Sequence, residues 1–223
     1  MSCYDAKASM LKFCRERRFE LLLTLYVPVY LALFFFAEAV VPTEGYWVSY
    51  LPLDDKIPFW EGGILFYDLW YPFLVGTGFF LLLRDKPAYR RFLYFIIISF
   101  TASIIFCILF PNGQNLRPEQ FARDNLLTRL VGGIYAVDTN TNVFPSIHVI
   151  GACICAAAWF DSPSLRRFRW GAALLAALIC ISTVWVKQHS VLDILGGLAV
   201  FLPLYMIIYR QRFVSCRLQK VGS

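Results

Sequence analysis

Six long apolar segments, each of 15–22 residues, run along this chain of 223 residues. A bilayer hydrocarbon core about 30 Å thick is crossed by roughly 20 apolar residues in a helix. The alternation of apolar and polar residues that marks a lipid-facing strand does not occur in these segments. We therefore predict an all-α, polytopic membrane protein in which residues 1–223 form one domain of six transmembrane helices. The predicted spans are 19–40, 65–83, 92–110, 146–160, 170–186 and 191–209.

The composition agrees with lipid as the solvent of much of the chain. Hydrophobic residues make up 59% of the sequence, charged residues make up 16%, and the mean hydropathy is +0.59. Soluble domains contain about 45–50% apolar and about 25% charged residues. The seven cysteines are odd in number, and none of them lies in a CxxC pair. This pattern argues against a disulfide framework and against a zinc site.

Lysine and arginine are distributed unevenly over the predicted loops. Sixteen of the 21 lie before the first span, between spans two and three, between spans four and five, or after the sixth span. Cytoplasmic loops collect positive charge, so we expect both termini in the cytoplasm. We also expect the chain to be a multi-pass protein of the plasma membrane. The net charge of +6 reflects this asymmetry, and no nucleic-acid partner is needed to explain it.

The loop at residues 111–145 lies on the other side of the predicted membrane and has 35 residues. Loops of this length usually have a function. Pro118, followed by Glu119, predicts the start of a short helix in this loop. The glycine pair Gly132-Gly133 is expected to end that helix.

Only two histidines occur in the chain, and the predicted topology places both at the outer membrane surface. His189 and Asp193 are four residues apart at the start of the sixth span, so that they share one face of a helix. A carboxylate at this spacing can accept the imidazole Nδ1–H and leave Nε2 as a nucleophile or base. His148 lies at the start of the fourth span, where free N–H groups and the helix dipole favour an anion. The pattern predicts a phosphate-handling site.

Two basic residues, Arg117 and Lys187, lie on the same side of the membrane as the histidines. An arginine can bind two phosphate oxygens at once, and a lysine contributes a point charge. For Glu38 and Asp68, which lie in or near spans, we expect structural or water-facing roles. A transporter more naturally carries ionisable groups at the bilayer midplane. The gathering of ionisable residues at one interface therefore favours an enzyme over a transporter or a structural membrane protein.

Three short motifs resemble the pattern of the type 2 phosphatidic acid phosphatase superfamily, also called lipid phosphate phosphatases. That pattern is K-x6-R-P, then P-S-G-H, then S-R-x5-H-x3-D, on a six-helix membrane fold. The matching residues are Arg117-Pro118, then Pro145-Ser146-Ile147-His148, then Ser182, His189 and Asp193. The sequence departs from the pattern at three positions, where Phe110, Ile147 and Thr183 replace the lysine, the glycine and the second arginine. The strings FPSIH and KQHSVLD are also similar to the branch that contains inositol phosphorylceramide synthase and sphingomyelin synthase.

The resemblance implies a phosphatase that needs no metal and no cofactor and hydrolyses a lipid phosphomonoester or pyrophosphate at the extracytoplasmic face. It implies His189 as the nucleophile that forms a phosphohistidine, Asp193 as its orienting partner, and His148 as the acid and base. The residues that it implies for phosphate binding are Arg117, Lys187 and Ser146. The expected partners are the lipid phosphate substrate and membrane lipids, with a homo-oligomer left open. The alternative is a lipid head-group phosphotransferase that uses the same residues.

Overall fold

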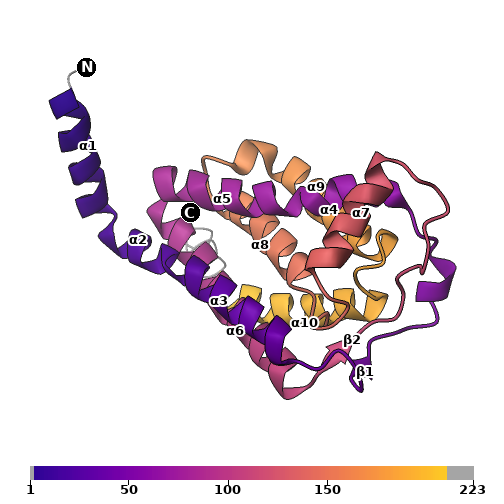
Figure 1. Ribbon diagram of the computed structural model, residues 1–223. Helices are drawn as coiled ribbons and strands as arrows, with labels where there is room; N and C mark the ends of the chain where they lie inside the picture. Colours follow the sequence, from indigo (N-terminus) through magenta and orange to yellow (C-terminus); the bar gives the residue numbers. More distant parts are fainter. Residues whose placement is uncertain (1–2, 210–223) are drawn as a thin grey trace, which may run out of the picture.

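A computed structural model describes residues 3–209 of the chain, with side chains from residue 10 onward. The described part is built almost entirely of helices, which confirms the predicted helical class (Figure 1). The α-helices are α1 (Cys3–Glu16), α2 (Arg18–Thr24), α3 (Tyr26–Val40), α4 (Ile64–Asp68), α5 (Trp70–Arg84), α6 (Lys86–Leu109), α7 (Leu126–Val137), α8 (Ile147–Asp161), α9 (Arg169–Trp185) and α10 (Val191–Ile208). The short elements are the 3-10 turns η1 (Asp54–Lys56), η2 (Glu61–Gly63) and η3 (Arg166–Phe168) and the strands β1 (Trp47–Val48) and β2 (Asn112–Gly113).

Five helical stretches are long and apolar enough to cross a membrane, so the chain is an integral membrane protein. These stretches are Arg18–Val40, Glu61–Arg84, Lys86–Leu109, Arg166–Trp185 and Val191–Ile208. They correspond to five of the six predicted spans. The remaining predicted span corresponds to α8, which has 15 residues. At about 1.5 Å per residue, α8 is roughly 22 Å long, shorter than the hydrocarbon core, so a sixth span stays a prediction.

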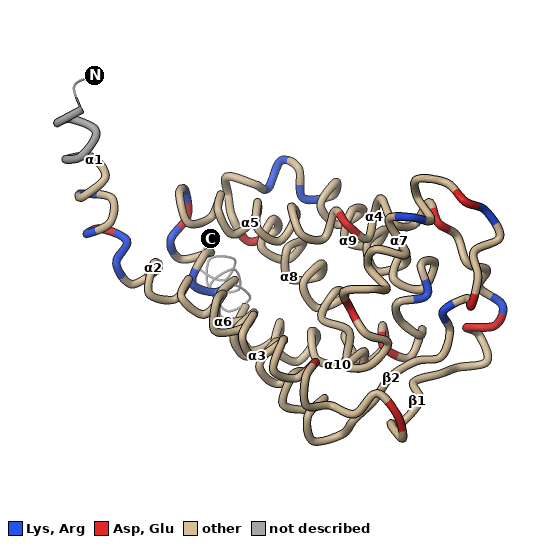
Figure 2. The backbone as a smooth tube through the Cα atoms, in the orientation of Figure 1, with Lys and Arg blue, Asp and Glu red and all other residues tan. Residues whose placement is uncertain are grey.

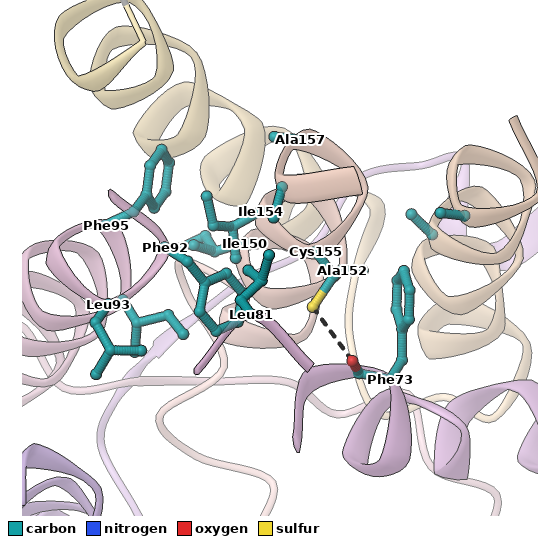
Figure 3. Packing of buried hydrophobic residues seen from close by; sticks show 14 of the residues in the cluster. Phe73, Leu81, Phe92, Leu93, Phe95, Ile150, Ala152, Ile154, Cys155 and Ala157 are labelled. Carbon is teal, nitrogen blue, oxygen red and sulfur yellow. Dashed lines mark hydrogen bonds between the residues drawn. The ribbon is translucent and has the colours of Figure 1, made fainter. Parts of the chain in front are cut away.

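Helix α8 lies inside the bundle, where it packs against α5, α6, α9 and α10. Its Ala152, Cys155 and Ala158 have no exposed surface, and small side chains of this kind let neighbouring helices approach closely. Figure 3 shows the larger side chains of α8 beside residues of α5 and α6, among them Leu81, Phe92 and Phe95. Because its neighbours cover α8, its N-terminus is held firmly in place at one end of the bundle.

The loop after α3 and the loop after α6 are joined by a short parallel pair of strands. Trp47 of β1 lies opposite Asn112 of β2, and Val48 lies opposite Gly113. Figure 1 shows this pair beside the ends of α3 and α6. The pairing connects the loop that precedes η1 with the long loop that contains α7.

The helix predicted to begin at Pro118 begins further along the chain, so this prediction is wrong in its boundaries. Asn125 caps α7: its side-chain oxygen accepts from the Thr128 N–H at 3.0 Å, and the Thr128 hydroxyl oxygen accepts from the Asn125 N–H at 2.9 Å. This reciprocal capping box fixes the start of the helix. Gly132 and Gly133 lie inside α7, whose contacts with α4 and η2 outweigh the weak helix propensity of glycine.

Charged residues lie at both ends of the bundle, as Figure 2 shows. Near the α5–α6 connection, Arg90 pairs with Glu20 and Arg91 pairs with Asp161, each at 2.6 Å. Around the loops that contain η1 and α7, basic residues are mixed with acidic residues. The cytoplasmic position of the termini stays a prediction. Five of the basic residues on which it was based lie outside the described side chains: Lys7, Arg210, Arg212, Arg217 and Lys220.

Candidate active site

The start of α10 brings His189 and Asp193 together. His189 Nδ1 lies 3.2 Å from Asp193 Oδ2, and the same oxygen accepts from the Ser190 N–H at 2.8 Å. Ser190 is the N-cap of α10 and Asp193 its third residue. The two predicted partners therefore meet, although His189 precedes the helix. Their contact arises from a capping box and not from a shared helical face.

The second histidine approaches from the start of α8. His148 Nδ1 lies 3.3 Å from His189 Nε2, and the Ser146 hydroxyl oxygen lies 3.3 Å from the same nitrogen. Ser146 is the N-cap of α8. The rings of Tyr67 and Trp70 lie against the His148 ring, with centroids 4.5 Å and 4.7 Å away. The imidazole of His148 is thereby held with Nδ1 facing His189.

Two glycines of α10 allow α8 and α10 to come this close. A Cβ on Gly197 would lie 2.9 Å from the Ser146 carbonyl oxygen and 2.9 Å from the Val149 Cβ. A Cβ on Gly196 would lie 2.3 Å from the Phe144 ring. Only hydrogen fits at these positions, so the contact between the two histidine-bearing segments depends on the glycine pair.

Arg117 is half-buried beside this site and holds the segment that follows α7. Its Nη2 donates to the carbonyl oxygens of Asp138 at 2.9 Å and Thr139 at 2.7 Å, and to the side-chain oxygen of Gln188. Its guanidinium carbon lies 4.4 Å from the centroid of the Tyr135 ring. Burial lowers the pKa of Arg117, and the nearby charge of Asp138 opposes this effect. Arg117 thus has no direct hydrogen bond to His189 in the described structure, but it binds the side chain of Gln188, the residue before His189.

The structure does not bring Lys187 into contact with the histidines. Its ammonium group donates to the backbone carbonyl oxygens of Asp54, at 2.8 Å, and Ile57, at 2.5 Å. Burial lowers its pKa, and the carboxylates of Asp54 and Asp55 oppose this effect. In this conformation the hydrogen bonds of Lys187 connect the η1 loop to the α9–α10 connection. Its predicted part in phosphate binding stays a prediction.

Several residues that support the site carry no signal in the sequence. The Ser49 hydroxyl donates to Asp193 Oδ1. The Asp54 carboxylate accepts from the Ser190 hydroxyl at 2.6 Å and the Val191 N–H at 2.8 Å. Both residues come from the loop before η2, far from any motif in the sequence. Gln188 could have been noticed only as the neighbour of His189.

A cavity of about 260 Å³ opens beside the two histidines. It is bounded by α3, α5, the segment after α7 and the starts of α8 and α10. Its lining includes Tyr30, Phe34, Trp70, Asp138, His148 and His189. A second, apolar hollow of about 570 Å³ lies between α8, α9 and α10 and contains neither histidine. Of these two cavities, only the smaller one is lined by the histidines.

The two acidic residues singled out in the spans have different surroundings. Glu38 accepts from the Thr139 hydroxyl and from the Asn142 side-chain amide, both at 2.6 Å. It therefore has a structural role, because it fixes the segment that forms one wall of the cavity. Asp68 lies at the end of α4.

Across residues 3–209, no group of three or more His, Cys, Asp or Glu side chains is arranged to hold a metal ion.

The fold and the site define a helical membrane protein with a paired-histidine site at one end of its bundle. A family model for the PAP2 superfamily matches residues 64–207, well over half of the chain. The chain belongs to the PAP2 superfamily, which confirms the resemblance found in its motifs. Neither a curated protein nor a solved structure matches the chain. Members of this superfamily are typically phosphatases, and membership indicates phosphatase or phosphotransferase activity on lipid phosphates.

Proposed function

We propose that this protein is a metal-independent lipid phosphate phosphatase that hydrolyses a phosphomonoester or pyrophosphate lipid at the extracytoplasmic face of the plasma membrane. One observation carries the proposal. Three buried nitrogens around His189 have no hydrogen-bond partner among the described residues: His148 Nε2, Arg117 Nε and Gln188 Nε2. Buried polar groups are almost always paired. A phosphate group at His189 would offer acceptor oxygens to such donors once the His148 ring, whose Nδ1 now faces His189 Nε2, turns toward it.

The contacts of His189 fit a nucleophile. Its Nδ1–H donates to Asp193, so Nε2 keeps its lone pair and attacks the phosphorus in line. The bond between phosphorus and the lipid oxygen breaks, and His148, protonated, gives a proton to that oxygen. The lipid leaves as an alcohol, and a phosphohistidine with a positively charged ring remains. Asp193 stabilises that charge.

Water completes the cycle. His148, now neutral, takes a proton from the water molecule whose oxygen attacks the phosphorus. The phosphorus–nitrogen bond breaks, phosphate leaves, and His189 is restored. Ser146 and the N–H groups at the start of α8 lie where they can stabilise the phosphate oxygens. Arg117 contributes positive charge from the Gln188 side.

The lipid chain would reach the site sideways from the outer leaflet, between α3 and α5. Phe35 and Tyr71 line the cavity and are also exposed at the surface of the protein. In a membrane this surface faces lipid tails. A single-chain or double-chain lipid could therefore place its phosphate at His189 while its tail stays in the bilayer.

The proposal is tested by following phosphate release from a panel of lipid phosphates with the purified chain in detergent. We expect His189→Ala to abolish turnover, because the nucleophile is lost. We expect Asp193→Asn to lower kcat by roughly 10²–10⁴, because the amide NH₂ of asparagine can face Nδ1 and hold the imidazole in the wrong tautomer. Wild-type protein quenched in base should carry a base-stable, acid-labile phosphoryl group that His189→Ala lacks. Asp124→Asn, at an outer carboxylate whose side chain is 77% exposed, is the matched control. Full activity of His189→Ala would refute the assignment.

A second candidate function is the transfer of a phosphorylated head group to a lipid alcohol. The small number of cations beside the histidines favours it. Thr183, in place of the motif's arginine, is buried and its hydroxyl donates to the Cys180 carbonyl oxygen at 2.8 Å. Lys187 is turned toward η1. A phosphodiester carries one negative charge less than a fully ionised phosphomonoester and requires fewer cations. Supplying an alcohol acceptor with a labelled donor separates the two: a new labelled lipid indicates transfer, and free phosphate indicates hydrolysis.

A further inference from the structure

Asp54, a buried residue of η1, binds the chain on both sides of His189. Its Oδ2 accepts from the Ser190 hydroxyl at 2.6 Å, and its Oδ1 accepts from the Val191 N–H at 2.8 Å. Its backbone carbonyl oxygen accepts from the Lys187 ammonium group at 2.8 Å. One residue of a distant loop therefore holds the position two before His189 and the two positions after it.

Ser190 connects Asp54 to the imidazole of His189. The Ser190 N–H donates to Asp193 Oδ2 at 2.8 Å, and His189 Nδ1 lies 3.2 Å from the same oxygen. The Ser190 hydroxyl oxygen accepts from the Leu192 N–H at 3.0 Å, and its hydrogen is donated to Asp54. The carboxylate that orients the imidazole is therefore positioned by Ser190, and Ser190 in turn is positioned by Asp54.

Asp54 is itself held in place by its own loop. The Leu51 N–H donates to Asp54 Oδ2 at 2.8 Å, and the Asp54 N–H donates to the Leu51 carbonyl oxygen at 2.8 Å. This loop is attached to the end of the strand pair, where the Ser49 N–H donates to the Gly113 carbonyl oxygen at 2.7 Å. Asp54 is 1% exposed. A buried carboxylate that is fixed by several donors can hold a neighbouring catalytic group in one orientation.

We propose that Asp54 is a positioning residue of the reaction, which acts through Ser190 to keep the Nε2 lone pair of His189 aligned with phosphorus. The inference rests on the proposed function, because it takes His189 as the nucleophile. The described residues that line the histidine cavity do not include Asp54, so it does not bind the substrate itself. A displacement of about 1 Å at reacting atoms can cost about 10² in rate. Asp54 therefore governs kcat and has little effect on KM.

Asp54→Asn in the full-length protein tests this role, with Asp55→Asn as the matched control. Asparagine keeps the shape of aspartate but has one acceptor oxygen, whereas donors from Leu51, Ser190 and Val191 converge on the Asp54 carboxylate. Asp55 is the exposed neighbour in the same loop. We expect Asp54→Asn to lower kcat for phosphate release by about 10- to 100-fold and to leave KM within about twofold of the wild-type value. Asp55→Asn should change neither.

Two measurements separate positioning from a loss of folded protein. In rapid-quench experiments with a labelled lipid phosphate, the amount of phosphorylated protein reports the folded fraction, and the rate constant of its formation reports the alignment of His189. A lower amount with an unchanged rate constant would overturn the proposal. In a Ser190→Ala background, Asp54→Asn should cost several-fold less than in the wild type. An equal cost in both backgrounds would show that Asp54 does not act through Ser190.

The tautomer of His189 gives a readout that needs no turnover. The chain has two histidines, so the ring nitrogens of protein labelled with ¹⁵N-histidine are assigned by comparison with His148→Gln. We expect His189 to carry its proton on Nδ1 in the wild type and in Asp55→Asn, and to populate both tautomers in Asp54→Asn. If the wild type turns over and Asp54→Asn does so at the same rate, only the positioning role fails. If the wild type releases no phosphate from any lipid, the hydrolase fails, and an unchanged tautomer in Asp54→Asn would then overturn the positioning role as well.

Discussion

Asp193 is the residue on which the geometry of the site depends most. Its carboxylate accepts from the His189 imidazole, the Ser190 N–H and the Ser49 hydroxyl. Donors to both oxygens orient the carboxylate, and the oriented carboxylate fixes the tautomer of the imidazole. The four-residue spacing in the sequence predicted this pair. Ser49 could not be predicted, because it lies 144 positions from Asp193 and only the folded chain brings them together.

Asp138 supports a prediction about stability and pH. Its folded pKa of about 6 lies above the ordinary value of 3.8, so the folded state binds the proton more tightly than the unfolded chain does. This contribution to stability is complete below about pH 4 and is lost as the pH rises through 6. We expect Asp138→Asn to raise the Tm at pH 8 and to leave it unchanged at pH 4.

Thermal unfolding in detergent at the two pH values measures this effect, with Asp124→Asn as the control. A shift of roughly 2–4 °C corresponds to about 1 kcal/mol for a chain of this size. The groups that set the pKa are Glu38, His189 and Arg117, beside the effect of burial. An equal change in Tm at both pH values would contradict the predicted titration.

In the connection between α9 and α10, the backbone directs the Lys187 side chain toward η1 and not toward the histidines, where the sequence predicts it. Lys187 has a positive φ of 53°, and its side chain extends to η1. We expect Lys187→Met to lower the Tm by several degrees, because two buried carbonyl oxygens lose a charged donor worth about 1–3 kcal/mol. The KM for a lipid phosphate should change little.

Lys56→Met, at an exposed lysine of η1, provides the comparison. Thermal unfolding and phosphate-release kinetics are measured on the same preparations. A KM that rises about tenfold or more while the Tm stays constant would instead establish the phosphate-binding role predicted for Lys187 from the motif.

The approach of α10 to α8 leads to a third prediction. Gly197→Ala would push its Cβ to 2.9 Å from the Ser146 carbonyl oxygen, so α10 must move away from the start of α8. A displacement of about 1 Å at a reacting pair can cost about 10² in rate. We expect kcat for phosphate release to fall by about this factor, with a smaller change in KM. Gly171→Ala is the control, since no atom lies within 4 Å of its added Cβ, and equal effects of the two would rule out the packing argument.

Most helices could be predicted from the sequence because lipid requires about 20 apolar residues in each span. The start of α7 could not be predicted in this way. Pro118 is the more obvious start signal in the sequence, but the capping box of Asn125 and Thr128 sets the actual start. The sequence shows that α8, with 15 residues, is short. Its central place depends on contacts with four other helices, which no local pattern contains. The histidine motifs could be predicted from the sequence, and the aromatic wall of the cavity could not.

At the scale of the whole molecule, the site lies at one end of a bundle whose two ends differ in charge. The connections around η3 and between α5 and α6 are rich in arginine and lysine, while the loops near the histidines carry both signs (Figure 2). Positive loops stay in the cytoplasm. We therefore expect the histidine cavity to face outward, where lipid phosphates of the outer leaflet would be the substrates proposed for it.

This orientation is testable by labelling with a membrane-impermeant maleimide. In a Cys14→Ser background, which removes an exposed native thiol, Asp124→Cys and Arg167→Cys each introduce a thiol at an exposed position. Asp124 precedes α7, and Arg167 lies in η3, which follows the end of α8 away from His148. We expect Asp124→Cys to be labelled in intact cells and Arg167→Cys only after the cells are opened, because η3 belongs to a basic connection. The background protein alone gives the blank. Labelling of Arg167→Cys in intact cells with protection of Asp124→Cys would place the histidines in the cytoplasm, and the lipid phosphates of the inner leaflet would then be the substrates that His189 can reach.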